Sequence, residues 1–444
     1  MEGLGVQGFP RRKGIGAYRR PYLCGAILLA VALWQVVGAS RASHGSDAWP
    51  QFRGPGGQGH TSATGLPLTW SPTENVTWRT AIPGLGWSSP VVSQGRVYLT
   101  TAVPLDPQDA GGDHSLRALA LDVATGAILW EVEVFQQEGA TAPAIHAKNS
   151  HASPTPIIEG DRLWVHFGHQ GTACLSVEGS VLWSSRELAY APVHGNGGSL
   201  SLVDGQLLFS CDGAERPLVA ALAPGDGRLR WQAARPVEAE KAFSFSTPLR
   251  IEVAGRSQVV CPGSDVVSSY DPASGAEIWR VRYSGYSVIP RPVTAHGLVY
   301  VATGYNTPSV LAIRPDGRGD VTESHVAWTL TRGAPHTPSL LVVDDRLYMV
   351  ADRGVATCVD ALTGEVIWQE RIGGNYSASP LYGDGRIYVQ SEDGTTVVLR
   401  DSREFEVLAT NSLGERTLAS YAVTGRALLV RTEESLYRIE AAAN

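Results

Sequence analysis

Ten residues with side chains suited to ligand binding or proton transfer stand just before successive apolar runs of the chain. They are Trp87, Asn149, His151, His194, Asn196, Phe243, Arg291, His336, Tyr376 and Arg416. Guanidinium groups bind carboxylates and phosphates through paired N–H donors, which makes Arg291 and Arg416 candidates for holding an anion. Imidazole exchanges protons and binds metals near neutral pH, so His151, His194 and His336 are candidate acid–base groups or metal ligands.

These residues also have a purely structural interpretation. Asn and His side chains in loops often hydrogen-bond free backbone groups. The segment His194-Gly-Asn-Gly-Gly illustrates both interpretations. Its glycines would let a ligand approach the backbone, or they bend the chain into an irregular strand. Polar groups that converge at the mouth of a channel can form a small-molecule site. Whether these residues converge depends on the structural elements that carry them.

A repeated unit carries them. Seven tryptophans recur at steps of 52, 53, 48, 48, 49 and 40 residues: Trp78, Trp130, Trp183, Trp231, Trp279, Trp328 and Trp368. Three of them end the pattern Asp-x-x-Thr/Ser-Gly-x-x-x-Trp, at 122–130, 271–279 and 360–368. The Asp carboxylate accepts backbone N–H groups in a turn, and Gly supplies a positive φ. The pattern therefore predicts a β-hairpin whose second strand contains the Trp.

A second pair of apolar strands, hinged by a short Gly turn, precedes each hairpin. Four strands in 40–50 residues are typical of a β-propeller blade, and a lone blade cannot bury its faces, so blades must stack. Eight units begin near Ser89, Thr155, Ser199, Thr247, Arg291, Thr337, Ser379 and Ala419. The sequence thus predicts an all-β, eight-bladed propeller of four-stranded blades, with each Trp packed between neighbouring blades.

The last unit lacks its hairpin and Trp, whereas the segment around Trp78 has no strands before it. We therefore expect this N-terminal strand to complete the last blade and close the ring, which removes the open sheet edge. Length alone would suggest two or three domains. The repeat instead predicts a single propeller domain over residues 43–444.

Residues 1–42 have a different composition. Arg11, Arg12, Lys13, Arg19 and Arg20 precede an apolar run over 23–37. This arrangement predicts either a secretory signal peptide, twin-arginine or ordinary, or an uncleaved N-terminal membrane anchor, although the run is short for a bilayer span. We expect a periplasmic or cell-envelope protein. Without residues 1–42 the formal charge falls from −7 to −12. Such an acidic domain is a poor partner for nucleic acid or for an anionic membrane surface, so we expect membrane contact only through residues 1–42.

The remaining cysteines, Cys174, Cys211, Cys261 and Cys358, are far apart in the sequence and form no metal-binding spacing. Free, buried thiols are expected, because strands of adjacent blades rarely bring two Cα atoms close enough for a disulfide. The segment 316–320, Asp-Gly-Arg-Gly-Asp, lies in the one lengthened hairpin. It offers too few ligands for calcium and is predicted to be a surface loop.

The Asp-x-x-Thr/Ser-Gly-x-x-x-Trp endings resemble the pyrroloquinoline-quinone (PQQ) repeat of the WD40/YVTN/PQQ-like superfamily. The opening segments 49–55 and 86–90 resemble those of exported PQQ-like propellers of planctomycete-type bacteria. The resemblance covers roughly residues 49–440 and implies two classes of function. Quinoprotein dehydrogenases bind PQQ and calcium in the ring, whereas the propeller lipoprotein of the outer-membrane β-barrel assembly machine is a scaffold without a cofactor. The repeat builds the ring in both classes.

The sequence departs from the dehydrogenase pattern, since adjacent cysteines and long insertions between blades are missing. We therefore assign no catalytic residue, cofactor or metal site and predict a monomeric, non-catalytic binding or scaffolding module. Its partner would be an envelope protein or a small molecule. The alternative is a PQQ- and calcium-dependent dehydrogenase that oxidises an alcohol or sugar. A third hypothesis is a small-molecule sensor or carrier that uses the predicted mouth residues without redox chemistry.

Overall fold

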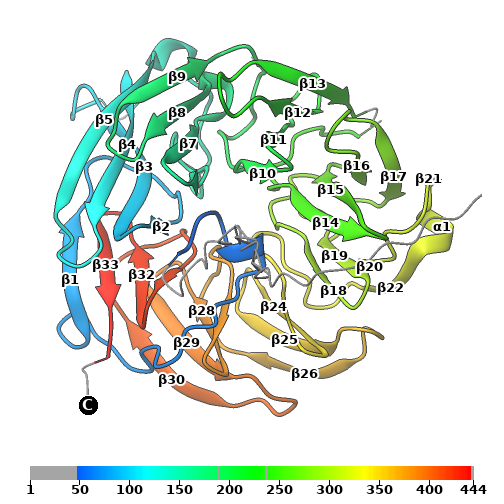
Figure 1. Cartoon of the computed structure of the whole chain (residues 1–444). Helices are drawn as coiled ribbons and strands as arrows, with labels where there is room; N and C mark the ends of the chain where they lie inside the picture. Colours follow the sequence, from blue (N-terminus) through cyan, green and yellow to red (C-terminus); the bar gives the residue numbers. More distant parts are fainter. Residues whose placement is uncertain (1–47, 110, 189, 236–238, 442–444) are drawn as a thin grey trace, which may run out of the picture. The chain divides into compact units, whose positions relative to one another are not determined.

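The computed structural model describes residues 48–441 except 110, 189 and 236–238, so the predicted signal segment lies outside the described residues. The described residues belong to one compact unit, 44–444. Within it, eight sheets, seven of them wholly antiparallel, are arranged in a ring (Figure 1). This architecture confirms the predicted eight-bladed propeller. No helix in the described part of the chain is both long and apolar enough to cross a bilayer.

Four strands build each of the first four blades, with a fifth in blade 4. Blade 1 contains β2 (Val91–Ser93), β3 (Arg96–Pro104), β4 (His114–Asp122) and β5 (Ile128–Gln137); blade 2 contains β6 (Ile157–Glu159), β7 (Arg162–His166), β8 (Thr172–Ser176) and β9 (Val181–Ser185); blade 3 contains β10 (Ser201–Val203), β11 (Gln206–Cys211), β12 (Leu218–Leu222) and β13 (Leu229–Ala234); and blade 4 contains β14 (Leu249–Val253), β15 (Arg256–Gly263), β16 (Val266–Tyr270), β17 (Glu277–Arg282) and β21 (Gly319–Asp320).

The second half of the ring repeats this order. Blade 5 contains β18 (Val293–Ala295), β19 (Leu298–Ala302), β20 (Val310–Ile313) and β22 (Val326–Leu330); blade 6 contains β23 (Leu341–Val343), β24 (Arg346–Ala351), β25 (Val355–Asp360) and β26 (Val366–Arg371); blade 7 contains β27 (Leu381–Gly383), β28 (Arg386–Gln390), β29 (Thr395–Arg400) and β30 (Val407–Ser412); and blade 8 contains β31 (Ala422–Thr424), β32 (Ala427–Arg431), β33 (Ser435–Ile439) and β1 (Val76–Ala81).

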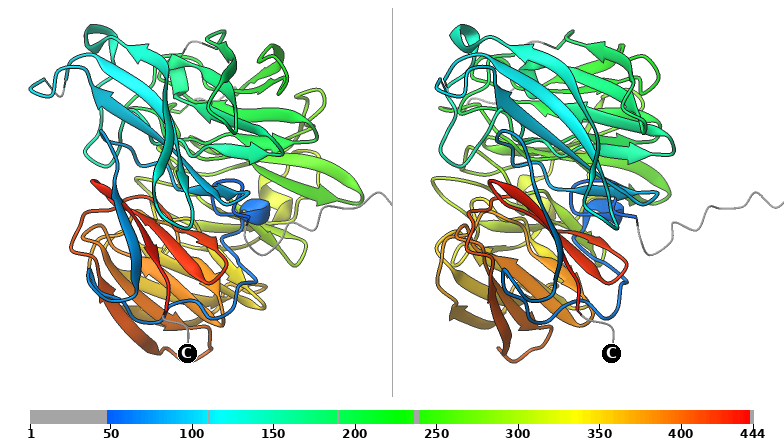
Figure 2. Two further views of the ribbon diagram at one scale, coloured as in Figure 1. Left: turned by 60° about the vertical axis from the view of Figure 1, so that its left-hand side comes forward. Right: turned by 90° about the vertical axis from the view of Figure 1, so that its left-hand side faces the viewer.

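The N-terminal strand β1 closes the ring, as predicted. It pairs antiparallel with β33, and Trp78 lies opposite Arg438. Figure 2 shows the blue β1 beside the red strands of blade 8. The strand β1, which leads directly into blade 1, is thus the outer strand of blade 8. Its backbone hydrogen bonds to β33 join the last blade to the first.

The segment predicted as a loop, 316–320, contains β21, which pairs in parallel with β17. A single helical turn, α1 (Thr322–His325), follows it. The lengthened hairpin of blade 5 is thus partly ordered as a fifth strand of blade 4, because the free edge of β17 offers unpaired backbone groups. The four cysteines predicted to be free thiols are free and buried.

The tryptophans join neighbouring blades, as predicted. The indole N–H of six of them donates, at 2.9–3.2 Å, to a carbonyl of the following blade: Trp78 to Val123, Trp130 to Val177, Trp183 to Pro224, Trp231 to Pro272, Trp328 to Ala361 and Trp368 to Ser402. For five of these six tryptophans the hairpin glycine of the following blade rests on the same indole, whereas Trp368 packs against Phe405. A Cβ added to Gly275 would lie 2.4 Å from the Trp231 ring. The repeated Gly and Trp are therefore two halves of one contact between blades.

Gly275→Ala is expected to lower the free energy of unfolding by about 2–3 kcal/mol, through a strained positive φ and overpacking against Trp231. Gly255 is a matched control in the same blade. It has a φ of +75°, and a Cβ there would meet nothing within 4 Å. Gly255→Ala should therefore cost only the φ strain, about 1 kcal/mol. Urea unfolding followed by tryptophan fluorescence measures both, and equal losses would contradict an indole contact.

Candidate functional site

A ring of serine and threonine hydroxyls surrounds the channel where the first strand of each blade begins. Backbone N–H groups donate at 2.9–3.1 Å from one blade to the hydroxyl of the next: Ser89 to Thr155, Thr155 to Ser199, Ser199 to Thr247, Arg291 to Ser339, Ser339 to Ser379, Ser379 to Ser420 and Ser420 to Ser89. We call these seven hydroxyls the hydroxyl ring. Units six and eight thus begin at Ser339 and Ser420, slightly later than predicted.

Arg291 occupies the eighth position of this ring and has no hydroxyl. Its guanidinium donates to the carbonyls of Phe52 (2.7 Å) and Pro248 (3.1 Å). The side chain is buried, and burial lowers its pKa to about 10, so it stays charged at neutral pH. Protein carbonyls thus take Nη donors of Arg291, the candidate for holding an anion, whereas its buried Nε donor has no partner among the described residues.

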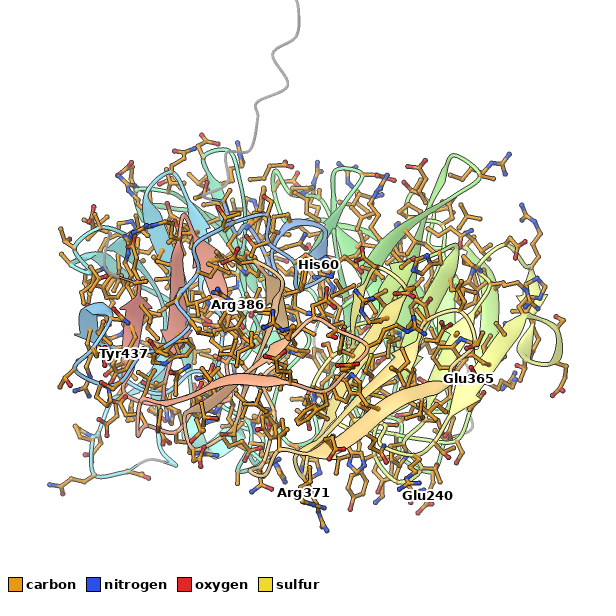
Figure 3. The ribbon with its side chains drawn as sticks, turned by 90° about the horizontal axis from the view of Figure 1, so that it is seen from below. His60, Glu240, Glu365, Arg371, Arg386 and Tyr437 are labelled. Atoms are coloured by element: carbon orange, nitrogen blue, oxygen red, sulfur yellow. The ribbon has the colours of Figure 1, made fainter. Side chains whose placement is uncertain are left out.

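The acceptor Phe52 belongs to a segment that crosses one end of the channel, the N-terminal plug (residues 49–59). Backbone and side-chain hydrogen bonds attach it to blades 1, 2, 5 and 7, through Val92, Ile158, Thr294 and Tyr382. Figure 3 shows His60, just after the plug, toward one side of the ring, and Glu240 and Arg371 at the other. The channel is therefore closed at the plug end.

The central cavity is the part of the channel beyond the plug, with a volume of about 910 Å³. Phe52 forms its floor, and all seven residues of the hydroxyl ring line its wall. The volume lies in the range of small-molecule sites. Five of the ten residues predicted at a channel mouth line this cavity: Trp87, Asn149, His194, Phe243 and His336.

Six aromatic rings form a continuous arc around the cavity, which we call the aromatic rim. Consecutive ring centroids are 5.3–5.9 Å apart in the order His146, His194, Phe243, Tyr286, Tyr305 and His336. Tilted and edge-to-face pairs at these distances are favourable. His146 and Tyr286 were not among the predicted residues, although they lie five residues before His151 and Arg291. Tyr305 lies in the turn between β19 and β20, where nothing in the sequence marks it.

Positive charge exceeds negative charge in the cavity lining. Lys148, Lys241 and Arg353 line it with one carboxylate, Asp352. Asp352 is already engaged, since it accepts the backbone N–H of His336 (2.7 Å) and the hydroxyl of Thr337 (2.6 Å). Lys148 pairs with Glu392 at 2.6 Å. The cavity of this acidic protein is therefore suited to anions.

The pKa of His194, a predicted residue of the rim, lies below its ordinary value. Burial, His146 and Lys241 all lower that pKa, so its imidazole is mainly neutral at pH 7. Its carbonyl accepts a hydrogen bond from the Asn149 amide (2.8 Å), and its φ is +63°. The His194 ring packs edge-to-face against His146 and Phe243.

His151 and Asn196 do not line the central cavity. The His151 ring packs on His114 with centroids 4.6 Å apart and hydrogen-bonds Gln137 (2.9 Å). Burial and the two neighbouring histidines lower the pKa of His151 to about 4. The buried Asn196 amide accepts the Tyr190 hydroxyl at 2.9 Å. Both residues support loops, which is the structural interpretation given above.

Tyr376 and Arg416 also lie apart from the lining. Tyr376 is buried between blades, and burial raises its pKa to about 12. The Arg416 guanidinium lies 5.3 Å from the centroid of the Trp87 ring and pairs with Glu433 at 3.3 Å. It borders a smaller hollow of about 390 Å³ beside the central cavity. Arg416 thus supports Trp87 from outside the cavity.

The cavity does not suit PQQ held with calcium. Calcium takes six to eight oxygen ligands, usually with several carboxylates. The cavity has one carboxylate, Asp352, whose oxygens are bonded to protein. No group of three or more His, Cys, Asp or Glu side chains with metal-binding geometry exists among the described residues. The four free cysteines do not line the cavity, so the donor set differs from the one that PQQ-dependent chemistry requires.

The eight blades, the Trp–Gly contacts and the closing N-terminal strand define a PQQ-repeat propeller. The chain belongs to the family described as outer membrane protein assembly factor BamB, whose model matches residues 33–233, 215–341 and 320–435. BamB of Marinobacter adhaerens is 35% identical over 78 residues, 18% of this chain and 20% of that protein. The match thus spans only a fifth of this relative's length.

Solved structures of two kinds share the fold. BamB from Moraxella catarrhalis has a TM-score of 0.58 and 13% identity, over 83% of this chain and 98% of its own. Quinohemoprotein alcohol dehydrogenase ADHIIG from Pseudomonas putida HK5 has a TM-score of 0.63 and 10% identity, over 90% of this chain and 81% of its own. At such identities the similarities show the fold alone, so function depends on the site.

Proposed function

We propose that this protein is a non-catalytic scaffold of the cell envelope, which residues 1–42 export and which binds a partner protein. Its membership of the BamB family carries this proposal. The donor set of the central cavity supports it, because one engaged carboxylate offers little to a calcium-bound quinone. The partner would be an envelope protein, in keeping with the assembly role in the family's name.

The outer strands of blades 1 and 2 provide a surface for such a partner. Leu129 on β5 is 47% exposed, and Leu182 on β9 is 49% exposed; Ile128 and Val181 beside them are also exposed. In the described residues β5 pairs only with β4 and β9 only with β8. Exposed apolar residues on a free strand edge favour the addition of an extended segment from another protein. In blade 4 the chain's own β21 covers the corresponding edge.

Photo-crosslinking tests this proposal. A photoreactive amino acid at Leu129 or Leu182 of the full chain, expressed in the source cells, should give one discrete protein adduct in the envelope fraction. The control position is Glu252 on β14, whose side chain is 61% exposed but lies on blade 4. It should give none. Equal adducts at all three positions, no adduct, or adducts in the cytoplasmic fraction would contradict the scaffold at these edges.

The second candidate is a PQQ-dependent dehydrogenase, favoured by the fold shared with ADHIIG over 90% of this chain. Calorimetric titration of the folded chain with PQQ, with and without calcium, separates the two. We expect no one-to-one binding and no reduction of an artificial electron acceptor with alcohols or sugars. Calcium-dependent, one-to-one binding together with dye reduction would establish the dehydrogenase instead.

A further inference from the structure

The hydroxyl ring presents buried hydrogen-bond donors that no protein group uses. Each of its seven hydroxyls accepts a backbone N–H, and none donates its own proton to an acceptor in the described residues. All seven side chains are buried and line the central cavity. A hydroxyl carries one donor, and buried donors find acceptors. A molecule that fills this cavity must therefore bring several oxygen acceptors to one level of the channel.

The aromatic rim selects a second property of that molecule. Its rings are held at fixed angles by one another, and Phe243 also contacts Phe245 at 5.9 Å. Tyr305 is 53% exposed, although it lies in contact with Tyr286 and His336. Rigid rings of this kind stack on flat, weakly polar faces while the hydroxyl and imidazole groups bond the edges of the ligand. Sugar rings combine a C–H face with a periphery of oxygens.

The charges of the lining select a third property. The Lys241 ammonium lies 4.6 Å from the centroid of the Tyr286 ring, and both residues line the cavity. No ion pair joins Lys241 or Arg353 to a carboxylate within the described ranges, whereas Asp352 is satisfied by its own loop. Two cations beside a wall of O–H donors complement acid groups rather than neutral or basic ones.

We infer that the central cavity binds an acidic saccharide, a short chain of sugar rings that bears carboxylate or sulfate groups. The sugar faces stack on the aromatic rim, the ring oxygens and acid groups accept protons from the hydroxyl ring, and Lys241 and Arg353 neutralise the charge. Phe52 of the N-terminal plug ends the site, so the saccharide enters from the rim alone. This inference is independent of the proposed scaffold, which uses the outer strands of blades 1 and 2.

Calorimetric titration of the full chain with trigalacturonate, a sulfated disaccharide, neutral maltotriose and a tetra-aspartate peptide tests the inference. We expect one-to-one binding of at least one acidic sugar, weakened by salt, and about tenfold or more weaker binding of maltotriose. The two acidic probes distinguish carboxylate from sulfate. Equal affinity for maltotriose, equal affinity for the peptide, or no binding of either acidic sugar at millimolar concentration would overturn the inference.

Variants locate the site. The double variant Lys241→Met and Arg353→Met should weaken acidic-sugar binding by about tenfold or more, because it removes both charges and keeps the side-chain length. Arg256→Met is the matched control, since Arg256 is exposed at the start of β15 and does not line the cavity. Thr247→Val removes one hydroxyl of the ring and should also weaken binding of the acidic sugar. If this variant does not fold, the double variant alone tests the assignment to this cavity. Unchanged affinity in the double variant would overturn the assignment to this cavity. Photo-crosslinking at Leu129 should be the same in every variant.

Discussion

Trp279→Ala is expected to lower the free energy of unfolding by about 3–5 kcal/mol, the largest loss among the seven repeat tryptophans. Trp279 is completely buried, whereas Trp231 at the corresponding position of blade 3 is half-buried. Its indole N–H donates to the Gln258 side chain (2.9 Å) within blade 4. Val321, which follows β21, packs in the same apolar cluster. The fifth strand therefore covers this tryptophan, and alanine would leave a cavity that the surrounding sheets cannot fill.

Urea unfolding of the wild type, Trp279→Ala and Trp231→Ala measures this difference. Trp231→Ala is the control, because it removes the same side chain and a similar hydrogen bond, to the Pro272 carbonyl at 2.9 Å. Its loss should be clearly smaller, since part of its surface is already in water. Circular dichroism confirms that both variants fold. Equal losses would mean that β21 contributes nothing to the burial of Trp279.

Asp212→Ala is expected to cost about 2–3 kcal/mol at neutral pH, because it removes the counter-charge of a buried arginine, while the loss of the buried Asp212 carboxylate itself offsets part of that cost. The Asp212 and Arg235 side chains are 0% and 1% exposed, with Oδ2 and Nη2 3.4 Å apart. Arg235 keeps only neutral acceptors, the Cys261 carbonyl and the Ser210 hydroxyl. The charge cannot reach water from between blades 3 and 4, so the variant retains an uncompensated cation.

The matched control is Asp226→Ala, which breaks the exposed ion pair with Arg228 and should cost under about 1 kcal/mol. The double variant Asp212→Leu and Arg235→Met removes both charges and should recover much of the loss. Urea midpoints at constant m-value compare the four proteins. A loss in Asp212→Ala no larger than in Asp226→Ala would contradict a paired arginine at this site.

The same pair gives a pH dependence. Burial outweighs the attraction of Arg235 and raises the pKa of Asp212 from 3.8 to about 6. The folded state therefore binds this proton more tightly than the unfolded state, and the contribution of Asp212 to stability falls as pH rises between these two values. Above the folded-state pKa, the contribution of Asp212 to stability no longer changes with pH. The stability difference between wild type and Asp212→Ala should narrow over this interval, and a constant difference would contradict the raised pKa.

Local patterns predicted most of the fold. The starts of the first strands predicted the number of blades, and the Asp–Gly–Trp endings identified the repeated unit, because each encodes a hairpin through turn chemistry and strand periodicity. The missing hairpin of the last unit predicted the closure by β1, which the pairing with β33 confirms. The exception is the segment 316–320. Its glycines and charges predict a loop, but the free edge of β17 draws it into a fifth strand, a long-range effect that no local pattern contains.

The sequence by itself determined the ring, the packing of the tryptophans between blades and five of the residues that line the central cavity. Only the tertiary structure decided how the remaining candidates are used. Arg291 lies in the correct register for the channel, yet the N-terminal plug, more than 230 residues away in sequence, takes its donors. Tyr305 reaches the aromatic rim from a hairpin turn with no repeat signal. Local turns and periodicity are encoded within a few residues, whereas partners across a channel are set by how all eight blades close.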